Sequence, residues 1–160
     1  MEFDEAKQKS RLNLVCCQFD IAWENKHLAP GAGVVVAETG GVKVVPLICY
    51  DLRFPELFRD AASKGAELFV VIASWPQQRA EHWRVLLQAR AIENQASVVG
   101  VDRCGSDPKN AYRGQSRVID PAGTVVADAG SGQCVMQIEI ALDSLTSYRQ
   151  KLPFLQDMRL

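Results

Sequence analysis

A cysteine at the end of an apolar run is the residue of this chain best placed to do chemistry. Residues 44–48 are mostly β-branched or aliphatic, which is typical of a buried strand, and the run ends at Cys49. Pro55 then begins an amphipathic segment, as proline often does at the first position of a helix. We therefore expect Cys49 on a tight strand-to-helix turn, where α/β sheets place reactive groups.

A thiol on such a turn is a candidate nucleophile. Backbone N–H groups around the turn can hold a developing oxyanion, and nearby donors of this kind lower the pKa of a thiol. The same position also suits a small buried core residue, because unpaired cysteine is among the most buried residue types. The pattern around Cys49 predicts its place in the fold and leaves both roles open.

The surrounding elements alternate between strands and helices with short links. A Gly40-Gly41 turn predicts an antiparallel hairpin leading into the Cys49 strand, and Gly65 is expected to cap the first helix. Strands are predicted over residues 12–19, 34–38, 68–73, 98–101, 115–119, 124–127 and 135–140. Helices are predicted over residues 56–64, 81–95 and 142–149, and residues 104–114 are expected to form a polar loop. The strand–helix order predicts right-handed parallel crossovers around a sheet.

Composition limits the classes of function. A chain of 160 residues with 48% hydrophobic and 23% charged residues is typical of one globular domain. A formal net charge of −1 gives no electrostatic surface for nucleic acid or an anionic membrane, and no apolar stretch approaches the roughly 18 residues of a membrane span. The charged start of the chain does not resemble a secretory signal.

Cysteine and histidine usage limits the cofactors. Five cysteines without regular spacing argue against a disulfide framework and favour a reducing, cytoplasmic location. With two histidines and no paired Cys-x-x-Cys, we expect no zinc site, no other metal site and no cofactor. Cys16, Cys17, Cys104 and Cys134 are expected to be core or surface thiols.

Several motifs together resemble one known family. They are ICYDLRFPE at residues 48–56, ASWP at 73–76, HW at 82–83, ARAIENQ at 89–95, YRGQS at 112–116 and DPAG at 120–123. This set resembles the nitrilase, or carbon–nitrogen hydrolase, superfamily, and its wording is most similar to that of the ω-amidases, which hydrolyse small terminal amides such as 2-oxoglutaramate. Residues 15–23 also resemble the first strand of the family.

The resemblance implies a fold and a site. The fold would be α/β, part of the nitrilase α-β-β-α sandwich, with the first strand and the carboxyl-terminal portion in one truncated domain over residues 1–160. Cys49 would be the nucleophile that forms a thioester, and the N–H of Tyr50 would hold the oxyanion. Other residues implied to bind substrate or support the site are Arg53, Glu56, Ser74 and Trp75.

The chain departs from the family where two further catalytic groups would stand. Members of the family use a glutamate base and a stabilising lysine, both from a segment that is collapsed here to the few residues between Glu24 and Leu28. Glu24 and Lys26 have the right residue types, but their neighbours resemble the end of the first strand, so the roles are not transferred to them. Loss of one member of such a set can cost on the order of 10⁴ to 10⁶ in kcat, so we expect activity to be impaired or absent.

Several other residues have a structural interpretation beside a functional one. Arg53 and Glu56 could orient substrate or form ion pairs around the turn, and Trp75 could line a pocket or pack in the core. Arg90, Glu93 and Asn94 lie within one helical turn, which favours a buried network or a dimer contact over chemistry. His82 is the candidate partner for a Cys–His pair, a pairing that the family does not use.

Three hypotheses follow from the sequence. The chain is an amide hydrolase by descent with reduced activity, a non-catalytic remnant or interaction subunit of the same fold, or an unrelated hydrolase that pairs Cys49 with His82. The partners expected are a small amide substrate and a second copy of the chain, because a sandwich that has lost strands leaves edges and one sheet face uncovered.

Overall fold

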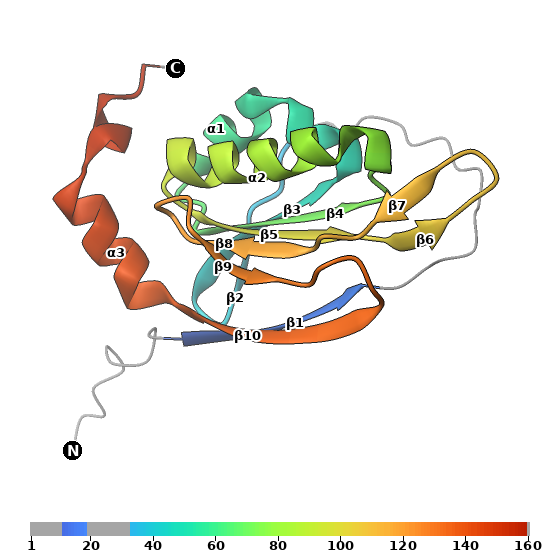
Figure 1. Cartoon of the computed structure of the whole chain (residues 1–160). Coiled ribbons are helices and arrows are strands. Elements are labelled where there is room, and N and C mark those ends of the chain that lie inside the picture. Colours follow the sequence, from blue (N-terminus) through green and yellow to red (C-terminus); the bar gives the residue numbers. More distant parts are fainter. Residues whose placement is uncertain (1–10, 19–32, 160) are drawn as a thin grey trace.

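A six-stranded sheet lies at the centre of the structure, a computed structural model that describes residues 11–18 and 33–159 (Figure 1). The strands are β1 (Arg11–Gln18), β2 (Ala37–Thr39), β3 (Val42–Ile48), β4 (Leu68–Ala73), β5 (Ser97–Asp102), β6 (Cys104–Ser106), β7 (Ala111–Arg113), β8 (Arg117–Ile119), β9 (Val125–Asp128) and β10 (Cys134–Ala141). The helices are α1 (Pro55–Ser63), α2 (Ala80–Asn94) and α3 (Leu142–Lys151), with 3₁₀ turns η2 (Cys49–Arg53), η3 (Gln77–Arg79) and η4 (Phe154–Asp157).

The middle of the sheet has the predicted parallel crossovers. β3, β4 and β5 are parallel neighbours, and α1 and α2 form the two connections between them. Both helices cover the same face of the sheet (Figure 1). Pro55 is the first residue of α1, and Gly65, at φ +87°, follows its last turn with its N–H bonded to the Ala62 carbonyl. The α/β class is confirmed.

The hairpin before Cys49 is shorter than predicted. Gly40 and Gly41 have φ of +57° and +73°, values that turn residues require in a tight antiparallel hairpin. However, β2 covers only Ala37–Thr39, whereas a strand was predicted over residues 34–38. The register pairs Ala37 with Val44, so its continuation would place Val35 opposite Pro46, which has no N–H to donate. Pro46 therefore ends the ladder early.

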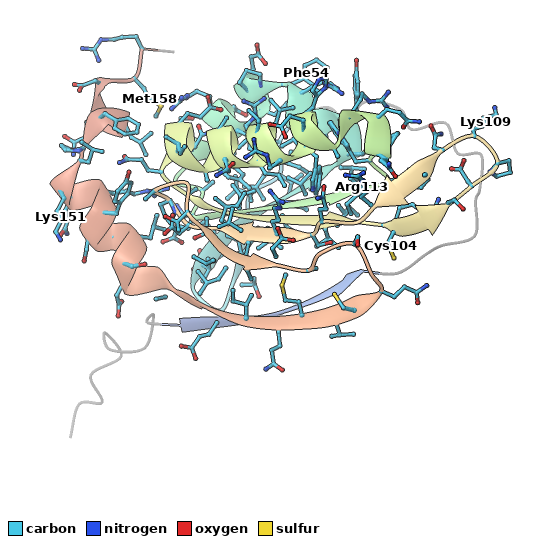
Figure 2. The ribbon with its side chains drawn as sticks, viewed as in Figure 1. Phe54, Cys104, Lys109, Arg113, Lys151 and Met158 are labelled. Atoms are coloured by element: carbon cyan, nitrogen blue, oxygen red, sulfur yellow. The ribbon has the colours of Figure 1, made fainter. Side chains whose placement is uncertain are left out.

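The face covered by α1 and α2 holds the larger core. Phe58 of α1 packs against Phe69 of β4 at 4.9 Å between ring centroids, and Leu87 and Ala91 of α2 are fully buried beside them. Gly100 of β5 gives room for α2, because an added Cβ would come within 2.5 Å of the Leu87 side chain. Side chains fill the space between the two helices and the sheet (Figure 2).

The opposite face is only partly covered. β10 pairs antiparallel with β1, and its inward side chains Met136, Ile138 and Ile140 pack on the amino-terminal half of the strands. Near the carboxyl ends of β3 and β4, the register neighbours Ile48 and Ile72 remain 46% and 52% exposed. β8 and β9 do not cover this face, because they extend the six-stranded sheet at its edge.

Residues 104–114 are not the loop that was predicted. β6 and β7 form a hairpin that projects from the carboxyl-end side of the sheet (Figure 1). Asp107 organises its tip: Oδ1 accepts the N–H groups of Lys109 and Asn110 at 2.8 Å, and Oδ2 accepts the Tyr112 hydroxyl at 2.5 Å. Asp107 and Pro108 are typical turn residues, but each strand beside the turn has only three residues, too few to show an alternating pattern in the sequence.

The last helix packs at the other end of the sheet. Arg149 of α3 donates to the Gln95 and Ala66 carbonyls, at 2.9 and 2.6 Å, in the links that precede β5 and β4. α3 therefore lies on the side opposite the β6–β7 hairpin (Figure 1). In the described part of the chain, none of the helices combines the length and the apolar character that crossing a membrane would require.

Candidate active site

Cys49 lies on the turn that the sequence predicts, directly after the last residue of β3. Its backbone is left-handed, with φ of +45°, a conformation that costs a non-glycine residue roughly 1 kcal/mol or more. Asp51 supports the turn from the following residues: its carboxylate accepts the Ile48 N–H at 2.8 Å, and its carbonyl accepts the Phe54 N–H at 3.0 Å. The turn thus holds Cys49 in a conformation that an unsupported chain rarely adopts.

A buried arginine fixes the same turn from α2. Arg90, 4% exposed, donates from Nη2 and Nε to the Leu52 carbonyl at 2.8 and 3.2 Å, and pairs with Glu93 at 2.9 Å. Asn94 donates to the Arg90 carbonyl and to Glu93. Of the two interpretations that were left open for Arg90, Glu93 and Asn94, the structure shows the buried network. Its effect is to tie the Cys49 turn to the helix layer.

The end of β4 forms the facing wall. A backbone hydrogen bond from Ser74 reaches the Cys49 sulfur. The next N–H, that of Trp75, donates to the Asp102 carboxyl at 2.6 Å, and the Trp75 indole donates to the Arg79 carbonyl at 2.8 Å. Trp75 is therefore both buried, at 3% exposure, and part of the wall, which unites the two roles considered for it.

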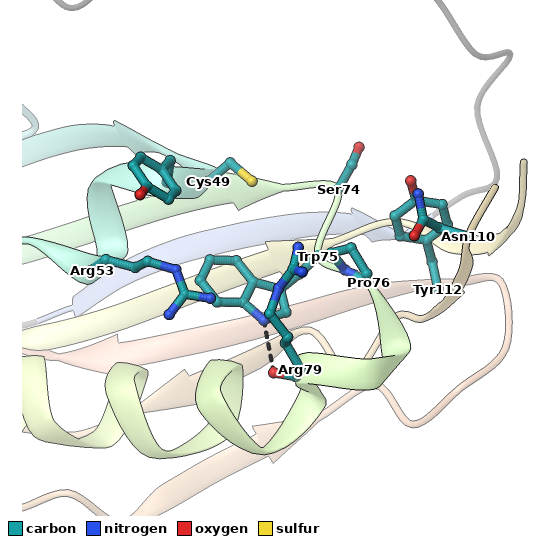
Figure 3. Close-up of a pocket in the computed structure, with 9 residues that line it drawn as sticks. Cys49, Arg53, Ser74, Trp75, Pro76, Arg79, Asn110 and Tyr112 are labelled. Atoms are coloured by element: carbon teal, nitrogen blue, oxygen red, sulfur yellow. Dashed lines mark hydrogen bonds between the residues drawn. The ribbon is translucent and has the colours of Figure 1, made fainter.

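A pocket of about 480 Å³ opens beside the thiol (Figure 3). Its walls come from the η2 turn, the end of β4, the η3 turn and the β6–β7 hairpin, and the lining residues are Cys49, Tyr50, Arg53, Ser74, Trp75, Pro76, Arg79, Asn110 and Tyr112. Cys49 points toward Ser74, and the two guanidinium groups lie on either side of Trp75 (Figure 3). The pocket combines one thiol with two fixed positive charges.

The electrostatics of the thiol differ from the sequence-based expectation. We expected backbone donors to lower its pKa, but burial raises the pKa of Cys49 above its usual value, and burial is the largest effect. The hydrogen bond from Ser74 and the charge of Arg79 lower the pKa, while the negative charges of Asp102 and Asp51 raise it. The donor is present as expected, but desolvation outweighs it. Cys49 is accordingly a protonated thiol at neutral pH.

Most of the predicted site residues meet in this pocket. Cys49, Tyr50, Arg53, Ser74 and Trp75 all line it. The Tyr50 side chain is 65% exposed and stacks edge-on against Phe54 at 5.2 Å. Glu56 lies outside the lining residues, exposed in the first turn of α1.

Arg53 contacts aromatic rings instead of the ion-pair partner considered for it. Its guanidinium lies 4.8 Å from the Trp75 ring centroid and 3.4 Å from Nδ1 of His82. His82 itself is exposed and is not among the pocket-lining residues, so the described contacts join it to Arg53 and give no support to a Cys–His pair. Glu24 and Lys26 lie outside the described residues.

Five residues of the site were not predicted from the sequence. Pro76, Arg79, Asn110 and Tyr112 line the pocket, and Asp102 lies behind Trp75. Asp102 carried a usable signal, since it is the polar residue that ends the third parallel strand, just as Cys49 follows the first. Tyr112 is the first residue of the YRGQS motif, but the motif alone did not indicate that it lines the pocket, and Asn110 lies in a hairpin that was predicted as a loop.

The remaining described cysteines are as expected and no metal cluster accompanies them. Cys104 is buried and Cys134 is partly buried, each as a free thiol. Cys16 and Cys17 lie in β1, and their side chains are outside the described residues. Within residues 11–18 and 33–159, no three His, Cys, Asp or Glu side chains gather as they would around a metal ion.

Comparisons with known proteins agree with this arrangement. Residues 7–150 match the family described as carbon-nitrogen hydrolase. The chain is 44% identical over 141 residues to an omega-amidase, YafV, of Escherichia coli, and 40% identical over 141 residues to a 2-oxoglutaramate amidase of Bacillus subtilis. These alignments cover 87% and 88% of this chain but 54% of each relative. The chain therefore spans about half the length of the relatives that it matches.

A solved structure shares the fold. The protein is a CN-hydrolase superfamily member from Xanthomonas campestris, and it matches 82% of this chain and 52% of its own with a TM-score of 0.77 and 34% identity. The likeness extends over most of the described elements and again leaves about half of the longer chain unmatched.

Proposed function

This chain belongs to the carbon-nitrogen hydrolase family, and on that premise we propose that Cys49 is an acyl-accepting nucleophile toward small amides, with slow or absent turnover. The observation that supports this most directly is the turn itself: Cys49 is held left-handed at the end of β3, against Ser74 and open to a pocket of about 480 Å³. Strained residues of this kind are found where a fold positions a reactive group.

The proposed reaction is acyl transfer to sulfur. The deprotonated Cys49 sulfur attacks the carbonyl carbon, the N–H of Tyr50 holds the oxygen of the tetrahedral intermediate, and the carbon–nitrogen bond breaks to leave a thioester. The proton lost by the thiol leaves with the nitrogen as ammonia. Water then cleaves the thioester to a carboxylic acid and restores the thiol.

The charges of the pocket support an anionic substrate. Arg53 and Arg79 present guanidinium groups beside the thiol, and Arg79 is close enough for its charge to act on Cys49. A terminal amide with a carboxylate at its other end would place its reactive carbon at the sulfur and its charge near Arg79. The 2-oxoglutaramate amidase of B. subtilis, which this chain resembles, is named for a substrate of that form.

Slow turnover follows from what surrounds the thiol. The nine described lining residues include neither glutamate nor lysine, the groups that the family uses beside its cysteine. Burial raises the pKa of Cys49, so its thiolate fraction at neutral pH is small, and none of the described lining residues carries a carboxyl or ammonium group that could protonate the leaving nitrogen. Acylation of Cys49 by an amide is therefore the step that we expect to be slowed most.

A non-catalytic, interacting protein is the second candidate, because the uncovered sheet face favours it. Ile48 and Ile72 leave an apolar patch at the carboxyl ends of β3 and β4, beside Pro46, which is also exposed. Apolar faces of this kind are usually covered in stable proteins. We propose that two copies of the chain associate through this face.

The odd number of cysteines, with the described ones free, supports a reducing, cytoplasmic location.

The test separates acylation from turnover. The p-nitrophenyl monoester of glutaric acid has a leaving group that departs as an anion, so it does not require a proton donor. We expect one equivalent of nitrophenolate per chain and an acyl adduct mapped to Cys49 by mass spectrometry. Cys49→Ser should lose the adduct, whereas Cys134→Ser, which removes another partly buried thiol, should keep it.

Charge selectivity is measured with the same assay. The uncharged p-nitrophenyl pentanoate has a similar length, and Arg79→Gln removes the charge but leaves a shorter polar side chain. We expect the wild-type chain to prefer the anionic ester and Arg79→Gln to lose about tenfold toward that ester alone, the effect of roughly 1.4 kcal/mol. Absence of any Cys49 adduct would favour the non-catalytic candidate.

A further inference from the structure

Asp102 is a buried carboxyl next to the candidate nucleophile, and the proposed reaction gives it no role. It is the last residue of β5, 3% exposed, and the register pairs it with Ala73 of β4. On the other side of β4, Ile48 pairs with Ile72, so Cys49 follows β3 at the level of Ala73. Cys49 and Asp102 therefore flank the same point of β4.

The wall of the pocket connects the two groups. Consecutive N–H groups of this wall divide between them: the Ser74 N–H bonds to the Cys49 sulfur, and the Trp75 N–H donates to Oδ1 of Asp102 at 2.6 Å. The Arg103 N–H donates to the Ala73 carbonyl of β4 at 3.1 Å, and it also lies near enough to the Asp102 carboxyl to lower the pKa of that group. One short piece of backbone thus holds both acidic groups.

The charged groups that act on the pair come from three segments. Asp51 belongs to the η2 turn that carries Cys49, Arg79 to the η3 turn, and Arg103 follows β5. Arg103 has partners of its own, since it stacks on the Tyr112 ring at 4.3 Å and lies 3.8 Å from Asp107. Burial raises the pKa of Asp102 to about 8, against the lowering effect of the Trp75 and Arg103 hydrogen bonds and of the Arg103 charge.

We propose that Asp102 is a positioning residue that sets when Cys49 ionises: its carboxyl holds the Ser74–Trp75 wall, and its negative charge opposes formation of the thiolate. The inference rests on the proposed function insofar as Cys49 is the reactive group of the chain. Two negative charges on either side of one buried strand repel each other, so the carboxyl and the thiol lose their protons in separate steps. The Cys49 thiolate therefore forms most readily while Asp102 is neutral.

Alkylation of Cys49 tests this without requiring amidase activity. The rate constant for iodoacetamide at Cys49 is followed by peptide mapping from pH 6 to pH 11 in the full-length chain. Asp102→Asn keeps an oxygen that can accept the Trp75 N–H and removes the charge. We expect its alkylation profile to shift to lower pH by about half a unit to one unit, which makes alkylation at pH 8.5 roughly threefold to tenfold faster.

Two further variants separate charge from shape. Asp102→Glu retains the charge, so its alkylation rate should rise at the same high pH as in the wild-type chain. A purely structural role predicts instead that Asp102→Glu behaves like Asp102→Asn. Asp143→Asn, an exposed carboxylate in the first turn of α3, should leave the profile unchanged. The proposal would be overturned if the alkylation profile of Asp102→Asn did not shift, or if that of Asp102→Glu shifted to lower pH.

The outcome is independent of the ester assay. If Cys49 forms no acyl adduct but the alkylation profile shifts in Asp102→Asn, the proposed function fails while the coupling between the two groups stands. If the adduct forms and the profile does not shift, the coupling fails alone.

Discussion

The two faces of the six-stranded sheet differ in how completely they are covered. On the helix side, Phe69 and Val71 of β4 are fully buried under α1 and α2. On the other side of the same strand, Leu68 is buried by the β1–β10 pair while Ile72 is 52% exposed. The covered face is built from segments that follow one another in the chain, and the other face is covered only where β10 lies over it. A sequentially continuous half of a fold can thus keep its local architecture and still lack the partner for one face.

Truncating a side chain in the covered core should lower the unfolding free energy more than any other change considered. Phe69→Ala removes a fully buried ring that packs on Phe58, and such changes cost about 3–5 kcal/mol. Ile72→Ala on the same strand removes a half-exposed side chain, for which we expect a loss of about 1 kcal/mol. Urea denaturation followed by circular dichroism measures both. Equal losses would show that the second face is covered in solution as completely as the first.

Asp102, at the carboxyl end of the sheet, should make stability depend on pH. Its pKa is raised to about 8 in the folded chain, so the folded state binds more protons than the unfolded state between about pH 4 and pH 8. The unfolding free energy should therefore fall as pH rises through this window, by at most about 1.4 kcal/mol per unit. Asp102→Asn should lack this component. A difference between the two chains that stays constant with pH would contradict the raised pKa.

Association should depend on the uncovered face. Replacing both Ile48 and Ile72 by Lys adds charge to the apolar patch, and we expect it to weaken self-association roughly tenfold and to reduce binding of the dye ANS. Val135→Lys is the matched control, because Val135 is 59% exposed on β10, away from the patch. Sedimentation equilibrium reports the association constant for all three chains.

The same experiment has a clear contrary result. The wild-type chain could sediment as a monomer, bind no ANS and melt cooperatively above about 60 °C, in the upper part of the melting temperatures usual for mesophile domains. That result would mean that the patch needs no partner. An effect of Val135→Lys as large as that of the double variant would place the interface on the outer face of β10.

The sequence predicts the covered half of the molecule well because its signals there are local. The apolar runs of β4 and β5, Pro55 at the start of α1 and Gly65 after its end each appear in consecutive residues. The β6–β7 hairpin was missed because its strands have only three residues each, although Asp107 and Pro108 are typical turn residues. β2 begins at Ala37, later than predicted, because of a cross-strand neighbour, Pro46. The sequence alone does not give the register that places Pro46 there.

The site divides in the same way. Cys49 follows directly from the end of its strand, and the motif resemblance adds Tyr50, Arg53, Ser74 and Trp75. The direction of the Cys49 pKa shift could not be predicted, because it depends on how much protein surrounds the sulfur rather than on which donors are nearby. Asn110 and Tyr112 reach the pocket only through tertiary structure.

We propose that the chain keeps a nucleophile, Cys49, on an intact turn, whereas the described pocket lacks the groups needed for turnover. The most direct measurement is ammonia release from 2-oxoglutaramate by the purified wild-type chain, with Cys49→Ser as the blank. We predict no release above that blank, because the described pocket holds neither a glutamate nor a lysine and the Cys49 thiol is protonated at neutral pH. Sustained ammonia release that Cys49→Ser abolishes would contradict the claim.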